Sequence, residues 1–175
     1  MARRREPRKV QGPPDLGAAV EIGLRFLGTR PRTSAELERR LLRAGCDSQT
    51  VEAALARLTE LGFVDDEAFA RWWSEQRDRH APRGRRLVEA ELRQRGVPRE
   101  VVEALRESAP DRREEDEGLP ETEEQRARAA LDRHLRGRPM PTETQAVQRI
   151  GTFLLRRGFD TETVRRAIRE RSAGD

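Results

Sequence analysis

Apolar residues recur at helical spacing on both sides of three glycines. Aligned on Gly45, Gly96 and Gly158, a leucine stands four positions before each glycine, another aliphatic residue eight before, and a valine six after. Residues three to four positions apart share one face of a helix, so the pattern predicts a helix, a short turn and a second helix, used three times. The three turns are Leu41-Leu42-Arg43-Ala44-Gly45-Cys46-Asp47, Leu92-Arg93-Gln94-Arg95-Gly96-Val97-Pro98 and Leu154-Leu155-Arg156-Arg157-Gly158-Phe159-Asp160.

Glycine suits these turns because it enters the left-handed backbone conformation without steric cost and favours the position just after a helix. Asp47 and Asp160 are placed to cap the following helix, whereas Pro98 suits a first helical turn. Residues 58–63 repeat the leucine, glycine and apolar order a fourth time. The apolar residue after each glycine is expected to pack on the preceding leucine: Cys46 on Leu41, Val97 on Leu92 and Phe159 on Leu154.

Helical spacing and capping residues predict nine helices, and no segment alternates in polarity as a strand does. Asp15 can start the first helix, Thr33 and Glu36 form a capping box for the second, and Asp65 or Asp66 caps the fourth. The fourth helix is expected to hold Phe69, Trp72 and Trp73 and to end at a break over 81–84. The other expected ranges are about 15–28, 33–44, 48–61, 85–95, 99–108, 122–136, 143–157 and 161–172.

Composition argues against one large core. Of the 175 residues, 34% are hydrophobic, 4% aromatic and 39% charged, against about 25% charged in an ordinary domain. Residues 109–124 hold eight acidic side chains and two arginines, so the rest of the chain is more basic than its net charge of +4 indicates. Small helical modules that lean on their neighbours fit this composition best.

We therefore expect an all-α, elongated tandem array of three three-helix repeats, each similar to a helix-turn-helix module. The expected parts are a basic flexible arm at 1–14, the first repeat at 15–62, the second at 63–108, an acidic linker at 109–121 and the third repeat at 122–175.

A set of motifs along residues 18–172 closely resembles the RecX family. Individually these motifs are weak signs of helix ends, but their order and spacing over three repeats are specific. They are Leu61-Gly62-Phe63-Val64-Asp65-Asp66, Phe69-Ala70, Arg77, Pro82, Gly84, Leu87, Leu92 and Gly96-Val97, with Arg30 and Ser34-Ala35-Glu36-Leu37 upstream and Phe153-Leu154-Leu155-Arg156-Arg157-Gly158-Phe159 downstream.

That resemblance implies tandem three-helix repeats and a partner, the RecA recombinase, bound as a filament on DNA. It implies a non-enzymatic regulator in DNA recombination, repair and the SOS response, which occupies the filament groove and modulates ATPase, strand exchange and coprotease activities. Inhibition is the expected sign. The basic arm and the acidic insertion depart from the family pattern, so their roles stay open.

The residues themselves predict neither catalysis nor a bound cofactor. Asp65, Asp66 and Glu67 have no further ligand at a helical interval, so capping and helix-dipole charge account for them. His80 and His134 lie far apart and show no ligand spacing, which argues against a metal site. No glycine-rich loop leads into Lys-Ser/Thr, so a nucleotide-hydrolase phosphate loop is excluded.

A single cysteine, Cys46, stands where a small apolar residue is wanted, and we expect a buried thiol. Nowhere do about 18 apolar residues run together, so no membrane span is expected. We expect a cytoplasmic monomer with no membrane partner.

Arginines clustered near the ends of the repeats are the candidate contacts to RecA or DNA, single- or double-stranded, because basic side chains bind phosphate whatever the base sequence. The competing interpretation is a solvated helix face, since many have a glutamate three or four residues away. The predicted contact residues are Arg83, Arg85, Arg86, Arg93, Arg95, Arg156, Arg157, Arg165 and Arg166.

An alternative function is a helix-turn-helix transcription regulator, because a helix, a short turn and a helix also outline a DNA reader. Such a reader needs cations on its second helix, and only the third repeat, with Arg165, Arg166 and Arg169, provides them. The aromatic residues Phe69, Trp72 and Trp73 offer base-stacking surfaces in principle, but their helical spacing favours a place in the core.

Overall fold

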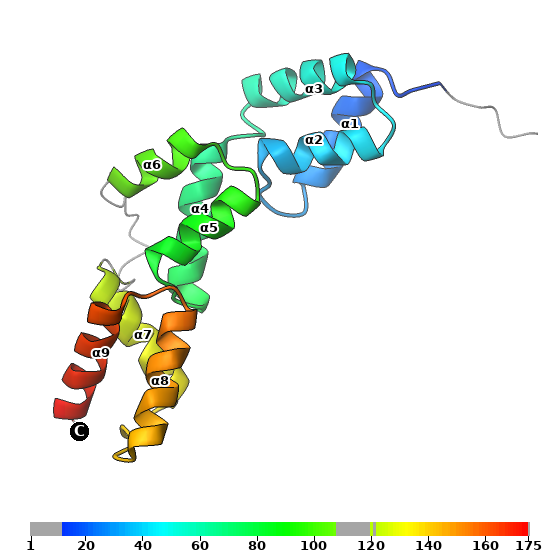
Figure 1. Ribbon diagram of the computed structural model, residues 1–175. Helices are drawn as coiled ribbons and strands as arrows, with labels where there is room; N and C mark the ends of the chain where they lie inside the picture. Colours follow the sequence, from blue (N-terminus) through cyan, green and yellow to red (C-terminus); the bar gives the residue numbers. More distant parts are fainter. Residues whose placement is uncertain (1–11, 108–119, 121, 175) are drawn as a thin grey trace, which may run out of the picture. The chain divides into compact units, whose positions relative to one another are not determined.

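Nine helices make up the part of the chain that the computed structural model describes, namely residues 12–107, 120 and 122–174 (Figure 1). The predicted all-helical class is confirmed, with no strand in these residues. Each predicted helix is present within a few residues of its expected bounds. The helices are α1 (Leu16–Leu27), α2 (Ser34–Arg43), α3 (Ser48–Glu60), α4 (Asp66–His80), α5 (Arg85–Gln94), α6 (Arg99–Glu107), α7 (Glu123–Leu135), α8 (Thr144–Arg156) and α9 (Thr161–Ala173).

The predicted glycine turns are confirmed at the level of backbone hydrogen bonds. Gly45, Gly96 and Gly158 have φ of 89°, 85° and 88°, and Gly62, the fourth example, has 74°. In the last turn Gly158 N donates to Leu155 O at 3.0 Å and Phe159 N to Leu154 O at 3.4 Å. The other three turns form the same pair of bonds, which satisfies carbonyls left over at a helix end.

Side-chain caps begin several helices as predicted. Asp15, Asp47 and Asp160 accept from the backbone N–H three residues later, at 2.8, 2.8 and 2.9 Å. Thr33 caps α2 in the same way at 3.0 Å, while the Glu36 carboxylate accepts from Arg30. A reciprocal capping box opens α7, where Thr122 and Gln125 exchange bonds.

The chain divides into two compact units, Met1–Asp65 and Asp66–Asp175. The first holds α1–α3 around a core with Leu37, Leu41 and Leu58, and Cys46 is buried there as predicted. The second holds two cores, one around Phe69 in α4–α6 and another in α7–α9. Each expected repeat therefore has its own apolar cluster. The exact repeat boundaries stay a prediction.

The expected basic arm at 1–14 and acidic linker at 109–121 lie almost entirely outside the described residues. Among the helices that are described, none is both long and apolar enough to cross a membrane.

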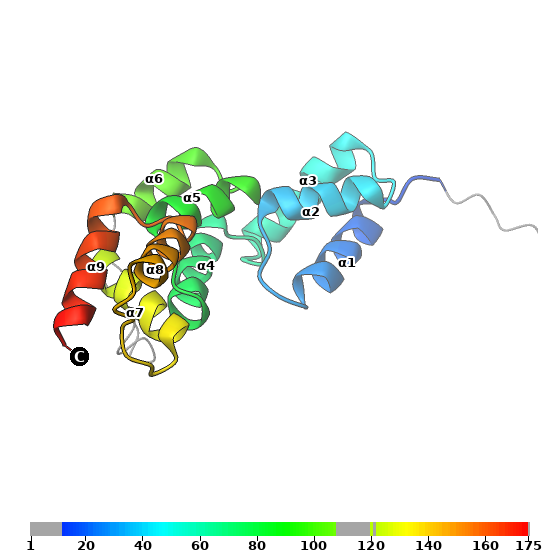
Figure 2. The ribbon, with the colours of Figure 1, turned by 60° about the horizontal axis from the view of Figure 1, so that its bottom comes forward.

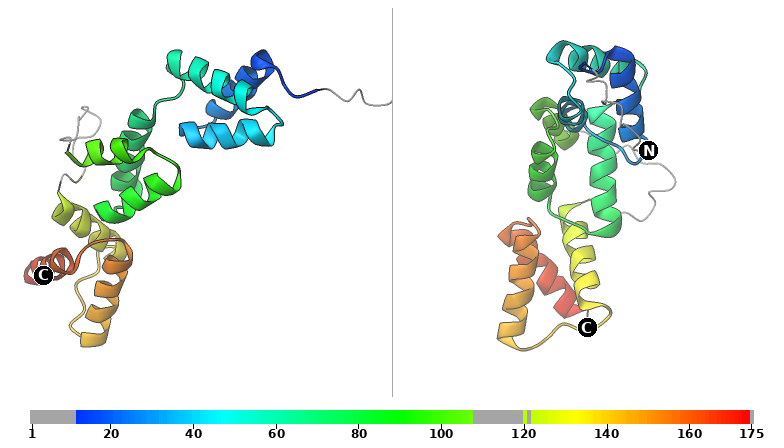
Figure 3. Two further views of the ribbon diagram at one scale, coloured as in Figure 1. Left: turned by 45° about the horizontal axis from the view of Figure 1, so that its top comes forward. Right: turned by 90° about the vertical axis from the view of Figure 1, so that its right-hand side faces the viewer.

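Within the second unit, the C-terminal end of α8 meets the turn between α4 and α5 (Figures 1 and 2). Gly84 N in that turn donates to Arg157 O at 2.8 Å. Helix α7 pairs with both α8 and α9, and α7 and α8 run side by side (Figure 3). This packing leaves one long face of α8 turned outward.

Candidate functional site

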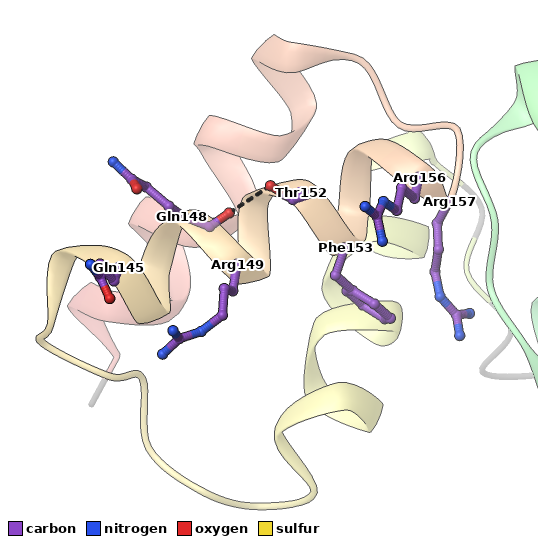
Figure 4. A pocket seen from close by; sticks show the side chains of 7 residues that line it. All are labelled: Gln145, Gln148, Arg149, Thr152, Phe153, Arg156 and Arg157. Carbon is purple, nitrogen blue, oxygen red and sulfur yellow. Dashed lines mark hydrogen bonds between the residues drawn. The ribbon is translucent and has the colours of Figure 1, made fainter.

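The outward face of α8 forms an open groove of about 760 Å³. Its lining residues recur every three or four positions, which is the spacing of one helix face. The opposite face of the same helix carries Ile150 and Leu154, both buried in the core of α7–α9. The groove residues are Gln145, Gln148, Arg149, Thr152, Phe153, Arg156 and Arg157 (Figure 4).

This face is cationic, because three of its seven lining residues are arginines and none is acidic. Arg149 and Arg156 are exposed and form no ion pair with any described residue. Gln145 and Gln148 add amide donors, and Thr152 Oγ1 is occupied by a bond to Gln148 O at 3.0 Å (Figure 4). We name this set the α8 groove, and its chemistry suits an anionic ligand.

Arg157, at the end of the α8 groove, is half-buried and has protein partners. Its Nη1 donates to Pro82 O at 3.1 Å, and its Cζ lies 4.7 Å from the centre of the Phe153 ring. Burial and then the nearby charge of Arg133 lower the pKa of Arg157, although a guanidinium still stays charged. Figure 4 shows its side chain directed toward the second repeat, apart from Arg149.

Phe153 forms the apolar floor between these cations. Its ring stacks on His134 of α7 with 4.1 Å between ring centroids. The guanidinium of Arg157 lies over the same ring, a favourable cation–π contact.

In the second repeat, Arg83 is engaged in an internal ion pair with Glu91. The same carboxylate accepts from Trp73 Nε1 at 2.9 Å and from Arg77 Nε at 2.8 Å. Burial, followed by the charges of Arg77 and Arg157, lowers the pKa of Arg83. Arg83 and Arg157, far apart in sequence, thus lie close enough for their charges to interact.

The remaining predicted arginines of the second repeat are not gathered into one site. Arg95 lies over the Trp73 ring, with Cζ 3.8 Å from its centroid, and Arg93 is 3.9 Å from Glu89. Arg85 and Arg86 are exposed at the start of α5. Arg85 lies beside Glu123, whose Oε1 accepts from the backbone N of Arg85 at 3.0 Å, so Arg86 is closer to the free cation expected there.

On the far side of the third repeat, arginines are neutralised by carboxylates of the neighbouring helix. Arg166 pairs with Glu124 at 3.2 Å and with Glu162 at 3.5 Å, while Arg165 is exposed. Three ion pairs join α7 to α9, and we name them the α7–α9 ladder: Arg166 with Glu124, Arg128 with Glu170, and Arg171 with Asp132.

The aromatic residues of α4 belong to the core, as predicted. Phe69 is buried, and Trp72 and Trp73 are half-buried against the same cluster. Their ring centroids lie 5.7 to 6.0 Å apart, so the three rings also contact one another.

Sequence reasoning missed Arg149, Gln145 and Gln148. The signal was present, because Arg149 and Arg156 are seven residues apart and therefore share a helix face. The glycine turn instead predicted the adjacent pair Arg156 and Arg157, but Arg156 is exposed whereas Arg157 bonds to Pro82 O.

Among the described residues, no group of three His, Cys, Asp or Glu side chains is arranged to hold a metal ion. The α8 groove likewise contains no nucleophile paired with a base. What the arrangement offers is charge and hydrogen-bond donors, the chemistry of binding.

Sequence models of the three RecX domains match the chain in order. The first three-helix domain matches residues 19–58, the second 65–105 and the third 121–168. The chain belongs to the RecX family. A regulatory protein RecX of Chlorobaculum tepidum is 37% identical over 153 residues, covering 87% of each chain, and one of Thermobifida fusca is 40% identical over 171 residues, covering 91% of this chain and 85% of that one.

Solved RecX structures share the fold. The crystal structure of RecX from Lactobacillus salivarius superposes with a TM-score of 0.69 at 14% identity, covering 89% of this chain and 96% of that chain. A second regulatory protein RecX has a TM-score of 0.65 at 19% identity, covering 87% of this chain and 72% of that chain. Family membership thus assigns the chain to a class of regulatory proteins.

Proposed function

We propose that this protein is a non-enzymatic regulator of the RecA recombinase that binds the RecA filament on DNA. Two observations support the proposal: the chain belongs to the RecX family along all three repeats, and the α8 groove presents cations without carboxylates. The proposed binding mode rests on the cationic α8 groove.

Arg149 and Arg156 are the side chains we assign to direct contact. Both are exposed, both belong to one helix face, and neither forms an ion pair among the described residues. An exposed arginine releases counterions when it meets a phosphate, so each contact adds affinity that falls with salt. Arg85, Arg86 and Arg165 are exposed as well and supply secondary contacts in this proposal.

Three linked repeats bind by adding weak contacts. Once one repeat is bound, the next meets its site at a high effective concentration, so overall affinity exceeds that of any single repeat. A protein held along the filament obstructs its growth and the rearrangements linked to ATP hydrolysis. Inhibition of ATPase, strand exchange and coprotease activities follows, with the protein acting as a cytoplasmic monomer.

The transcription-regulator alternative needs α9 to read bases. Its Arg166 is already paired with Glu124 and Glu162, and the corresponding helix of the second repeat carries Glu100 and Glu103 on its exposed side. A carboxylate repels the DNA backbone, so these helices are poor readers. Equal affinity for unrelated DNA sequences is the outcome that our proposal predicts.

Cosedimentation with RecA on single-stranded DNA, with and without a non-hydrolysable ATP analogue, tests the proposal. We expect the protein to pellet with the nucleotide-bound filament and to lower RecA ATPase activity, without hydrolysing ATP on its own. Sequence-selective binding to free duplex DNA together with no binding to the filament would instead favour the transcription regulator.

A further inference from the structure

One residue, Arg157, joins the second and third repeats through both its backbone and its side chain. Its carbonyl oxygen accepts from Gly84 N at 2.8 Å, and its Nη1 donates to Pro82 O at 3.1 Å. Both partners belong to the turn between α4 and α5, which meets the end of α8 in Figure 3.

Two glycines allow this close approach. A Cβ added to Gly84 would lie 2.3 Å from Gly158 O, and one added to Gly158 would lie 2.5 Å from Leu87 Cβ. The φ of Gly84 is −63°, a value that any residue adopts. The neighbouring repeat, and not the local backbone conformation, therefore requires glycine at position 84.

A buried ion pair forms a second connection between the repeats. Arg126 Nε of α7 lies 2.8 Å from Asp78 Oδ1 of α4, and their side chains are only 14% and 10% exposed. Nearby, Arg133 Nη2 donates to Arg79 O at 2.8 Å. The Asp78 and Arg126 pair opposes separation of the two repeats, because a buried charge that loses its partner is strongly disfavoured.

We propose that these contacts make the second and third repeats one cooperative folding unit, and that Arg157 is a positioning residue that fixes the α8 groove. We call the contacts of Gly84, Arg157 and Gly158, with the Asp78 and Arg126 pair, the junction. The role assigned to Arg157 in presenting the groove rests on the proposed function, whereas cooperative folding does not. In this account Arg156 contacts the filament and Arg157 holds the helix in place.

The chain carries its own reporter for the folding claim. Its two tryptophans, Trp72 and Trp73, both lie in α4, so their fluorescence reports unfolding of the second repeat. Leu131 is fully buried in the core of the third repeat, and Leu131→Ala lowers the stability of that repeat. If the junction couples the repeats, this variant lowers the tryptophan transition by roughly 5 °C or more.

Gly84→Ser is the variant that should break the junction, and Leu131→Ala is then measured in it. Serine is a preferred N-cap, so local capping alone predicts a higher melting temperature for α5. The junction predicts a lower one, because the added Cβ meets backbone atoms of Gly158 and Phe159. In this background we expect Leu131→Ala to leave the tryptophan transition unchanged.

Two results would overturn cooperative folding. In one, Leu131→Ala does not change the melting temperature followed by tryptophan fluorescence; in the other, Gly84→Ser melts at a higher temperature than the parent protein. If the second repeat of Gly84→Ser does not fold, Arg157→Gln replaces it, because this substitution adds no atom at the contact. The effect of Leu131→Ala is then measured in the Arg157→Gln variant.

Filament binding measured across a salt series tests the positioning role. We expect Arg157→Gln and Gly84→Ser to raise the Kd severalfold while the salt dependence stays parental, since neither removes a phosphate contact. A slope flatter by about 0.7–0.9 for Arg157→Gln would make Arg157 a direct contact and overturn the assignment. If the parent protein does not bind the filament at all, the proposed function fails, while the melting experiment still decides the folding claim.

Discussion

The two faces of the third repeat carry similar numbers of arginines but use them differently. On the α7–α9 ladder, Arg128, Arg166 and Arg171 each meet a carboxylate of the facing helix. In the α8 groove, Arg149 and Arg156 meet no carboxylate among the described residues. The difference shows that pairing, and not the number of arginines in the sequence, distinguishes a surface that holds helices together from one available to a ligand.

The largest loss of stability is expected at Gly158, the glycine of the turn that follows α8. Gly158→Val places a β-branched residue at φ of 88° and adds a Cβ next to Leu87, so it should destabilise the protein by more than the ~1–2 kcal/mol of left-handed backbone alone. Gly62→Val is the matched control, because Gly62 has φ of 74° with no atom within 4 Å of an added Cβ. Equal losses in urea unfolding would remove the packing role of Gly158.

The second-largest effect is expected on the affinity for the RecA filament. Charge reversal at both Arg149 and Arg156 should weaken filament binding by about tenfold or more, roughly 1.4 kcal/mol, since two attractive charges become repulsive. Reversal at Arg128 and Arg166 moves the same charge on the other face and should weaken binding less. Far-UV circular dichroism verifies that both variants are folded, and equal losses of affinity would erase the distinction between the faces.

Prediction from sequence succeeded where the determinants are local. The turn at Gly158 and the cap at Asp160 depend on residues a few positions away, and both have the predicted geometry. The fate of Arg157 depends on Pro82, 75 residues earlier, and that of Arg166 on Glu124, 42 residues earlier. No periodicity specifies such partners, so the predicted arginine set mixed exposed cations with internally bonded ones.

A smaller effect is expected from the cap of α9, the helix that carries Arg166 and Arg171 of the ladder. Asp160 accepts from Thr163 N at 2.9 Å and from Thr163 Oγ1 at 2.8 Å, and these bonds hold the pKa of Asp160 below its ordinary value. Asp160→Ala should cost about 1 kcal/mol near neutral pH, with filament binding unchanged.

Because the folded pKa of Asp160 is depressed, its contribution is present above the unfolded value and lost as the pH falls through the folded value. The stability difference between parent and Asp160→Ala should therefore shrink in acid, as measured by urea unfolding at several pH values. A constant difference would mean that the carboxylate does not act through its charge.

The smallest effect is expected within the ladder itself. Arg128 and Glu170 are 56% and 43% exposed, and surface pairs of this kind contribute about 0–1 kcal/mol. Arg128→Gln should lower the melting temperature slightly, more at low salt than at high salt, and leave ATPase inhibition unaltered. Loss of inhibition in this variant would place part of the binding surface on the ladder.

The most direct test of the central claim, that the α8 groove contacts the filament, is the salt dependence of filament binding for two neutralised variants. For Arg149→Gln with Arg156→Gln, the slope of log K against log salt should flatten by about 1.4–1.8, which is 0.7–0.9 for each lost phosphate contact. For Arg128→Gln with Arg166→Gln, which removes the same charge from the ladder, the slope should match the parent. A parental slope for the groove variant, or equal flattening in both, would contradict the account.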